Sequence, residues 1–457
     1  MGRYRQIVLS VAFLLGLASV AVGQYFGKNK VQYTYFHWQY IQTRHFDIYY
    51  TDGGKKLAEY VAQKAEEGYE HLSQDFRYEL LDRITIIVYR SHNDFEQTNV
   101  DLSPPEESVG GFTEFFKNRV VIPYEGQWEQ FRHVIQHELT HAVQMQMMYG
   151  TGVMSIVMGM TRLQLPLWFV EGIAEYESLG WDTDSDMFMR DATLNGYVPP
   201  IPYLNAFMAY KGGQSVWYYI AQRYGQEKIG EIQGKVKISR NVENGFRRAI
   251  GLSIEELSER WHKYLKKRYW PDIAGRDEPE DVAKKLTDHK KDGSFVNLSP
   301  VMNPRGDKVA FMSDKSGYFD VYLVSTIDGK LLGKVVSGQR SGSLEELHWL
   351  KGRNLSWSPD GKFLILSAKA GPKDELHVVD VAKKKIVNSY TFDLDGVYNP
   401  TWSPKGDKVV FSGMVKGQSD LYLLDLQSRK LTKLTDDVFS DIEPAWSPDG
   451  QWIAFAS

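Results

Sequence analysis

Residues 133–144 read HVIQHELTHAVQ, and this stretch carries the strongest signal in the chain. Within it, His137, Glu138 and His141 form the pattern His-Glu-x-x-His. The stretch is predicted to be helical, and a spacing of four residues puts both imidazoles on one face of a helix. Two neutral imidazoles one turn apart can bind one Zn²⁺ ion, and the glutamate after the first of them points towards the open position of the metal. The pattern therefore predicts a zinc site with His137 and His141 as ligands and Glu138 as the general base.

A third protein ligand must come from another segment. Residues 165–180, LPLWFVEGIAEYESLG, contain a second predicted helix that begins after Pro166 and carries Glu171 and Glu175. These two glutamates are also four residues apart and share one face of that helix. His133 lies one turn before His137, but a histidine in such a place is more often a surface or hydrogen-bonding residue, so it is assigned no role.

The segments around these motifs predict a mixed α+β domain. Residues 45–50 and 84–89 look like strands, each is followed by helical periodicity, and Ser91 is expected to cap the brief second helix. Residues 110–124, GGFTEFFKNRVVIPY, are typical of a hairpin whose second strand stops at Pro123. Helical periodicity then dominates from about residue 127 to residue 270. Residues 271–293 lose this periodicity and gain charge, so we place a linker there.

The second half of the chain contains a repeat. Four related segments begin at Met302, Trp357, Trp402 and Trp446 and read MNPRGDKVAFMS, WSPDGKFLILSA, WSPKGDKVVFSG and WSPDGQWIAFAS. The last three begin 45 and 44 residues apart, a period typical of four-stranded propeller blades. The first interval is about ten residues longer, so GQRSGSLEELHWLKGRN is expected to carry an insertion. Because a closed propeller needs at least four blades, residues 294–457 predict an incomplete all-β propeller of about three and a half blades.

The composition is that of a globular protein without a strong net charge. With 457 residues, the chain exceeds what one hydrophobic core usually organises. Its 54 basic and 58 acidic side chains give no electrostatic reason to expect nucleic acid as a partner. There is no cysteine, which excludes disulfides, thiolate metal ligands and a cysteine nucleophile. A metal would therefore be held by histidine and carboxylate groups.

Residues 1–23 have the pattern of a cleavable signal peptide. Arg3 and Arg5 precede an apolar run from Ile7 to Val22, and small residues come just before Gln24. The alternative is an uncleaved membrane anchor, but the run is short for a spanning helix and no stop-transfer charge cluster flanks it. We therefore expect an exported protein that keeps no stable membrane span after cleavage. Its place would be the periplasm, the outer membrane surface or the medium.

The segment WFVEGIAEY, residues 168–176, is similar to a segment of the glutamate-zincins, the thermolysin and aminopeptidase clan. In that clan an aromatic-flanked Glu-Gly supplies the third zinc ligand. The resemblance implies that Glu171 binds zinc. It also implies that Glu175 accepts a hydrogen bond from a ligand histidine, which fixes the tautomer of that histidine.

The resemblance further implies that a Tyr or His from the helical half stabilises the oxyanion. Residues 209–225, AYKGGQSVWYYIAQRYG, offer Tyr210, Tyr218 and Tyr219 for this role. Tyr210 is preferred because it precedes a Gly-Gly turn. The spacing of the three tyrosines also fits the buried face of a helix.

The order of segments over residues 25–270 resembles the peptidase MA-like domains of exported bacterial proteins, and the repeats resemble the periplasmic Tol-system propeller. This resemblance implies an α+β zincin-like metallopeptidase domain over residues 24–270, then the linker and the incomplete propeller.

These features predict a secreted zinc-dependent metallopeptidase of a peptide or protein substrate, with the propeller as a docking or substrate-filter module for a possible envelope protein partner. The alternative is a non-catalytic envelope protein that binds partners through its propeller and keeps only a remnant metallopeptidase domain. The intact His137, Glu138, His141 and Glu171 argue against a remnant.

Overall fold

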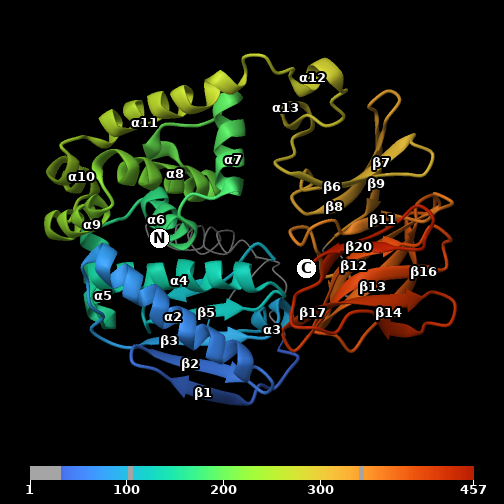
Figure 1. Ribbon diagram of the computed structural model, residues 1–457, viewed down its shortest axis with the longest axis horizontal. Coiled ribbons are helices and arrows are strands. Elements are labelled where there is room, and N and C mark those ends of the chain that lie inside the picture. The colour runs from blue at the N-terminus through green and yellow to red at the C-terminus, as the bar shows by residue number, and fades with distance from the viewer. Residues whose placement is uncertain (1–31, 101–106, 339–343) are drawn as a thin grey trace, which may run out of the picture.

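Figure 1 shows the computed structural model, which describes residues 32–100, 107–338 and 344–457. The predicted signal peptide, residues 1–23, lies outside the described residues. The described chain has two parts that lie side by side, a region of helices and one mixed sheet, and a region made of strands (Figure 1). This order confirms the predicted fold class, an α+β region followed by an incomplete all-β propeller.

The first part is built on a five-stranded sheet with the strand order β1-β2-β3-β5-β4. Its strands are β1 (Trp38–Gln42), β2 (Phe46–Thr51), β3 (Ile84–Tyr89), β4 (Phe112–Glu114) and β5 (Arg119–Pro123). β2, β3 and β5 are parallel, whereas β1 and β4 are antiparallel strands at the two edges. The predicted hairpin is confirmed as β4 and β5, with Asn118 at a φ of 53° in its turn. The edge strand β4 lies next to the helix that carries the histidine motif.

Helices cover this sheet and form the rest of the first part. They are α2 (Lys55–Phe76), α3 (His92–Phe95), α4 (Trp128–Tyr149), α5 (Val153–Arg162), α6 (Leu167–Leu179), α7 (Thr183–Leu194), α8 (Ala206–Tyr224), α9 (Glu227–Ser239), α10 (Val242–Ile250) and α11 (Ile254–Tyr269), with the short α12 (Pro279–Val282) and α13 (His289–Asp292) after them. Ser91 caps α3 as predicted, because its hydroxyl accepts a hydrogen bond from the backbone N–H of Asp94. Within the described ranges no single helix is long and apolar enough to cross a bilayer. Among these residues, α5 and α6 together reach the length and apolar composition of a membrane span, but the two helices are bent by 117° relative to each other.

α6 and α8 pack with their backbones in direct contact. A Cβ atom on Gly172 would lie 2.5 Å from the Cα atom of Gly213, and one on Gly213 would lie 2.5 Å from the carbonyl oxygen of Trp168. Any larger side chain at these two positions would force the helices apart. The glycines therefore set the distance between Glu171 on α6 and Tyr210 on α8.

The second part consists of consecutive antiparallel sheets. The first is β6 (Asn297–Met302), β7 (Lys308–Ser313), β8 (Asp320–Ser325) and β9 (Leu331–Val336), and the second is β10 (Glu346–Leu347), β11 (Leu355–Trp357), β12 (Phe363–Ala370), β13 (Lys373–Asp380) and β14 (Lys385–Thr391). The third is β15 (Gly396–Trp402), β16 (Lys408–Val415), β17 (Gln418–Asp425) and β18 (Leu431–Lys433), and two strands of a fourth follow, β19 (Ile442–Trp446) and β20 (Ile453–Ala456). The repeated turn needs its glycine, since Gly306, Gly361, Gly406 and Gly450 all have a φ between 68° and 79°.

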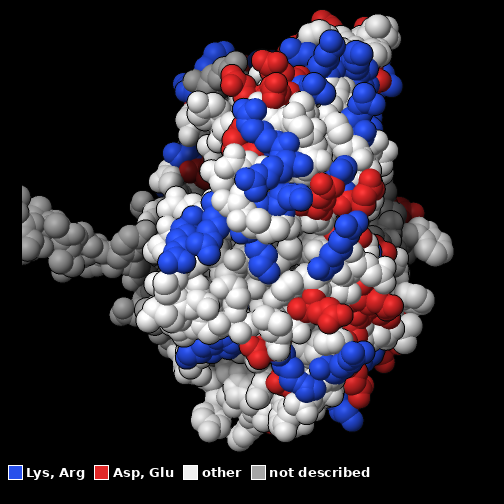
Figure 2. Space-filling view, turned by 90° about the vertical axis from the view of Figure 1, so that its left-hand side faces the viewer, with Lys and Arg blue, Asp and Glu red and all other residues white. Residues whose placement is uncertain are grey.

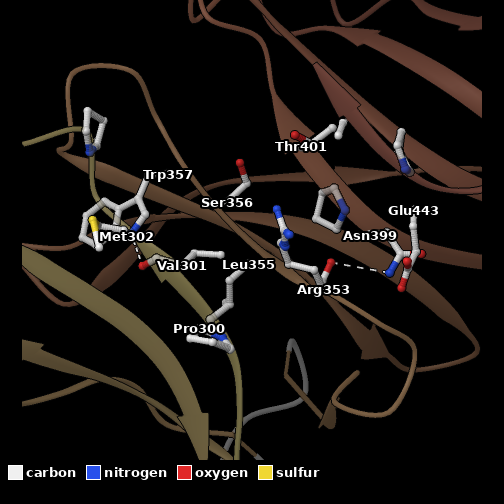
Figure 3. A pocket seen from close by; sticks show the side chains of 14 residues that line it. Pro300, Val301, Met302, Arg353, Leu355, Ser356, Trp357, Asn399, Thr401 and Glu443 are labelled. Atoms are coloured by element: carbon white, nitrogen blue, oxygen red, sulfur yellow. Dashed lines mark hydrogen bonds between the residues drawn. The ribbon is translucent and has the colours of Figure 1, made fainter. Parts of the chain in front are cut away.

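The inner strands of these sheets line a cavity of about 510 Å³. Figure 3 shows residues of β6, β11, β15 and β19 around this cavity. The larger polar side chains that line it are Arg353, Asn399 and Glu443. This cavity lies where these four strands of the successive sheets meet. It is separate from the histidine motif on α4.

The two parts of the molecule are joined by a set of buried polar residues that we call the interdomain cluster. It consists of Asn93, Glu96, Glu107 and Glu125 in the first part and Glu346, His348, Lys351, Lys369 and Asp374 in the second. Three of these residues, Glu346, His348 and Lys351, come from the segment whose extra length predicts an insertion. The longer first interval of the repeat therefore supplies three of the five residues that the second part contributes to this cluster, and Lys369 on β12 and Asp374 on β13 supply the others.

His348 lies between two carboxylates in this cluster. Its Nδ1 atom is 3.1 Å from Glu107 Oε1, and its Nε2 atom is 3.0 Å from Asp374 Oδ1. Burial disfavours a charged imidazole, but the negative charges of Asp374 and Glu107 outweigh it and raise the pKa of His348 well above its ordinary value. His348 is therefore the cation that neutralises a carboxylate from each part.

We expect His348→Ala to lower the free energy of unfolding by about 3–5 kcal/mol, because it leaves two buried carboxylates without their cation. The side chains of Glu107 and Asp374 are 3% and 0% exposed. Urea unfolding of the full chain measures the change. His37→Ala, at an exposed position, is the control and should cost no more than about 0.5 kcal/mol. Equal stability of the two variants would refute a stabilising role for His348.

Figure 2 shows the face of the molecule that is at the left of Figure 1, where the helices and mixed sheet of the first part lie. Lys and Arg side chains gather on the upper, helical half of this face, with Asp and Glu side chains among them. A largely uncharged area lies below them on the left of this view. The visible face therefore carries charges of both signs.

Candidate metal centre

Three donor atoms from α4 and α6 converge in the first part of the molecule. His137 Nε2 and His141 Nε2 are 3.1 Å apart, and Glu171 Oε2 lies 3.3 Å from the first and 3.2 Å from the second. The two histidines face the same side because they are one turn apart on α4, and the packing of α6 across α4 brings the carboxylate to them. These are the three residues for which the sequence predicts a role as zinc ligands.

The donor set and its geometry fit a zinc ion. Zinc bonds of about 2.0–2.2 Å in a tetrahedron place the ligand atoms about 3.3–3.6 Å apart, close to the three spacings in this centre. Burial opposes a charge on His137, but hydrogen bonds with Glu171 and Glu175 raise its pKa to about 10. The surrounding carboxylates thus stabilise positive charge at the point where the three donor atoms meet.

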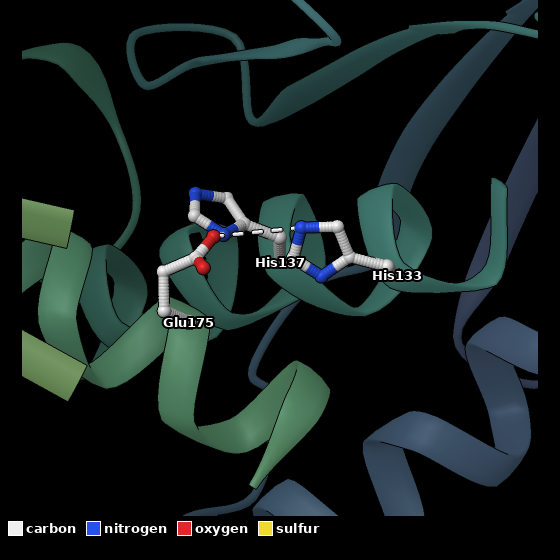
Figure 4. Close-up of side chains that lie close together, drawn as sticks. All are labelled: His133, His137 and Glu175. Carbon is white, nitrogen blue, oxygen red and sulfur yellow. Dashed lines mark ion pairs between the residues drawn. The ribbon is translucent and has the colours of Figure 1, made fainter. Parts of the chain in front are cut away.

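Glu175 lies behind the centre and contacts His137 from the other side of the ring. Its Oε1 atom is 3.2 Å from His137 Nδ1 and 3.4 Å from His133 Nε2, so the carboxylate lies between the two rings (Figure 4). A carboxylate facing Nδ1 favours the tautomer with its proton on that nitrogen, which leaves the Nε2 lone pair for a metal. His133, His137 and Glu175 could by proximity also hold a metal themselves, but the Nε2 atom of His137 points to His141 and Glu171.

Lys211 on α8 neutralises the second oxygen of Glu175. Its Nζ atom donates to Glu175 Oε2 at 2.8 Å and to Ser185 Oγ at 3.2 Å. Burial alone would raise the pKa of Glu175, but the hydrogen bond with His137 and the charge of Lys211 lower it to about 2. Glu175 is therefore ionised and able to accept a hydrogen bond from His137 at neutral pH.

Glu138 is held by the edge strand of the sheet. The hydroxyl oxygen of Thr113 on β4 lies 2.7 Å from Glu138 Oε2 and 3.0 Å from the backbone carbonyl oxygen of Glu138, and its single hydrogen is donated to the nearer carboxylate. The close approach of strand and helix leaves little room for a side chain at position 111, since a Cβ atom there would lie 3.1 Å from Glu138 Cγ. Strand β4 thus fixes the carboxylate of Glu138 beside the three donor atoms.

Only one of the three candidate tyrosines lies at this centre. The ring of Tyr210 stacks on His137 with 6.0 Å between the ring centroids. Burial and a hydrogen bond with Glu171 raise the pKa of the Tyr210 phenol, so it is protonated and can donate. Tyr218 stacks instead on Trp181, and Tyr219 packs against Tyr264.

Sequence reasoning missed two contributors to the site and gave His133 no role. Thr113 and Lys211 have no motif of their own, and they reach Glu138 and Glu175 only through the packing of β4 and α8. His133 contacts Glu175 through its Nε2 atom, and its Nδ1 atom forms a hydrogen bond of 3.0 Å with Ser178 Oγ. Its place one turn before His137 was the signal that could have pointed to this contact.

Two family models match separate parts of the chain. Residues 64–267 match the family model of the Peptidase MA superfamily, and residues 356–457 match the model of the TolB beta propeller domain. A comparison with curated proteins finds no match.

Many solved structures resemble part of the chain. TolB from Acinetobacter baumannii is 22% identical, with 35% of this chain and 37% of that chain covered and a TM-score of 0.29. Hydrazine synthase from Kuenenia stuttgartiensis is 20% identical, with 35% of this chain and 41% of that chain covered and a TM-score of 0.27. The chain therefore covers less than half the length of either, and neither likeness bears on function. Residues 64–267 of the chain are thus similar to the Peptidase MA superfamily, and residues 356–457 are similar to the TolB beta propeller domain.

Proposed function

We propose that the chain is an exported zinc-dependent metallopeptidase that hydrolyses peptide bonds and uses its propeller as a docking or substrate-filter module. The convergence of His137 Nε2, His141 Nε2 and Glu171 Oε2 within 3.1–3.3 Å of one another, beside Glu138, is the observation that supports it most. These three residues would hold the zinc ion. When bound, zinc supplies a Lewis acid that lowers the pKa of a water molecule and polarises the scissile carbonyl. N-terminal sequencing of the mature protein, expected to begin near Gln24, tests the export.

Glu138 moves the proton in this mechanism. Thr113 occupies its Oε2 atom, so Oε1 is the atom that takes a proton from the attacking water. When the C–N bond breaks, the same oxygen returns the proton to the leaving amine. Thr113 keeps the carboxylate oriented through both transfers.

Tyr210 stabilises the charge that develops on the substrate carbonyl oxygen. Its protonated phenol lies over His137 and beside Glu171, so it can donate a hydrogen bond to an oxyanion at the metal centre. Because this donor is already in position, little reorganisation energy is needed during the reaction. Tyr210 thus supplies the electrostatic part of catalysis.

An extended peptide fits along β4. This strand ends the sheet, pairs with β5 on one side, and contacts Glu138 through Thr113. A substrate backbone that adds to its other edge would pass the general base. Beside Thr113 a cavity of about 260 Å³, lined among others by Phe115, Ala142, Met145 and Tyr149, can take a substrate side chain. The proposed substrate class is therefore an extended, largely unfolded polypeptide.

Zinc-dependent cleavage tests this function. We expect the zinc-loaded full chain to cut casein or a peptide library, a zinc chelator to reduce cleavage to the level of a buffer control, and added Zn²⁺ but not Mg²⁺ to restore it. Mass spectrometry of the products measures the cleavage and locates the bonds cut. A chain that binds zinc at this centre yet cuts no peptide would contradict the proposal and favour the binding-protein alternative.

A further inference from the structure

A second set of metal-binding side chains lies between α2 and α6, on residues that the centre described above does not use. His71 and Asp75 come from α2, and Glu177 comes from α6. His71 Nε2 lies 3.2 Å from Glu177 Oε2 and 3.8 Å from Asp75 Oδ2, and all three donor atoms lie within 4.8 Å of one another. The spacing of four residues puts His71 and Asp75 on one face of α2. The three side chains therefore point to a common position.

Glu177 is the observation that points to a ligand. Its side chain is 0% exposed, and neither of its carboxylate oxygens has a hydrogen-bond partner among the residues that the structure describes. Burial of a carboxylate is costly, and here it raises the pKa of Glu177 even though the neighbouring His71 imidazole acts in the opposite direction. By contrast Glu175, two residues earlier on the same helix, has Lys211 and His137 as partners. Glu177 lies beside one imidazole only, and a cation in front of it would supply the missing partner.

The donor set and spacing suit zinc. One imidazole and two carboxylates are ligands that zinc accepts, and a tetrahedral ion needs ligand atoms about 3.3–3.6 Å apart, between the two spacings from His71. The His71 side chain is 54% exposed, so water can reach the fourth position. Gln226 donates to Asp75 Oδ2 at 2.6 Å and orients that carboxylate, as partners of metal ligands do.

We propose that His71, Asp75 and Glu177 bind a second zinc ion. The ion would tie α2, which packs on the sheet, to α6, which carries the ligand Glu171, and would stabilise the packing of these two elements. The proposal does not rest on peptidase activity, because none of its three ligands belongs to the centre on α4.

Metal analysis of six forms of the full chain tests the proposal. Each form is incubated with Zn²⁺ and desalted, and the number of zinc ions per chain is measured by inductively coupled plasma mass spectrometry. We expect two zinc ions per chain in the wild type, one in Glu177→Gln, one in Glu171→Ala and none in the double variant. His71→Ala, at a half-exposed position that tolerates truncation, should also bind one. Glu70→Gln, an exposed change on the same helix, is the matched control and should bind two.

The pattern of counts separates the two sites. One zinc ion in the wild type and in Glu177→Gln, with none in Glu171→Ala, would overturn the second site and leave the centre on α4 intact. One in the wild type and in Glu171→Ala, with none in Glu177→Gln, would support the second site and overturn the other. Zinc should also raise the melting temperature of Glu171→Ala but not of the double variant, a readout independent of activity. A wild type that binds no zinc would overturn both.

Discussion

Glu138→Gln is expected to reduce kcat/KM for peptide cleavage by about 10³-fold, within the range usual for general acid–base catalysis. The amide has nearly the shape of the carboxylate and can still accept the hydrogen bond from Thr113, but it cannot take a proton from water. The three donor atoms of the metal centre are unchanged, so zinc content should stay at the wild-type value. Cleavage kinetics and metal analysis on the same preparation measure both quantities.

Two comparisons make this expectation specific. Glu129→Gln, at an acidic residue in the first turn of the same helix, should leave kcat/KM unchanged. Tyr210→Phe should lower kcat with little change in zinc content, because it removes a donor to the oxyanion and no ligand. Cleavage by Glu138→Gln at the wild-type rate would exclude Glu138 as the base, and an unchanged kcat in Tyr210→Phe would exclude the role given to Tyr210.

Glu171→Ala is expected to remove zinc from the centre on α4 and with it all measurable cleavage. The substitution deletes one of the three proposed protein ligands and leaves two imidazole nitrogens 3.1 Å apart without the carboxylate that completes the donor set. Isothermal titration of the metal-free protein with Zn²⁺ measures the loss of affinity. The binding event assigned to this centre should disappear from the titration.

Glu175→Ala is the matched control, four residues further on the same face of α6. It removes the partner of His137 Nδ1 but no ligand, so zinc affinity should fall only about 10–100-fold. Full retention of zinc by Glu171→Ala, or complete loss in Glu175→Ala, would reverse the roles given to the two glutamates. The two variants therefore separate a ligand from a residue that orients a ligand.

Local spacing explains which parts of this protein could be predicted. His137, Glu138 and His141 lie within five consecutive residues of one helix, so helical geometry alone brings the two imidazoles together. The propeller repeats are likewise local, since turn, strand length and period recur within each segment. The role of Glu171 needed the likeness of WFVEGIAEY to a known family, because no spacing rule connects two helices separated by a loop.

Residues without a motif could not be predicted, because their roles depend on packing between distant segments. Thr113 and Glu138 are 25 residues apart, and Lys211 and Glu175 are 36 apart. His348 meets Glu107 across 241 residues, at the contact of the two parts of the molecule. Long-range contacts of this kind follow from how sheets and helices stack.

The sequence by itself determined the helix face that carries His137 and His141, the α+β and all-β halves and the position of the first repeat's insertion, since each of these follows from residue order over one or a few turns. Only the tertiary structure decided which tyrosine lies at the centre, that Thr113 holds Glu138, that the insertion contributes to the interdomain cluster, and that Glu177 is buried opposite His71. The physical reason is that burial and charge pairing depend on neighbours that the fold, and not the chain order, brings together.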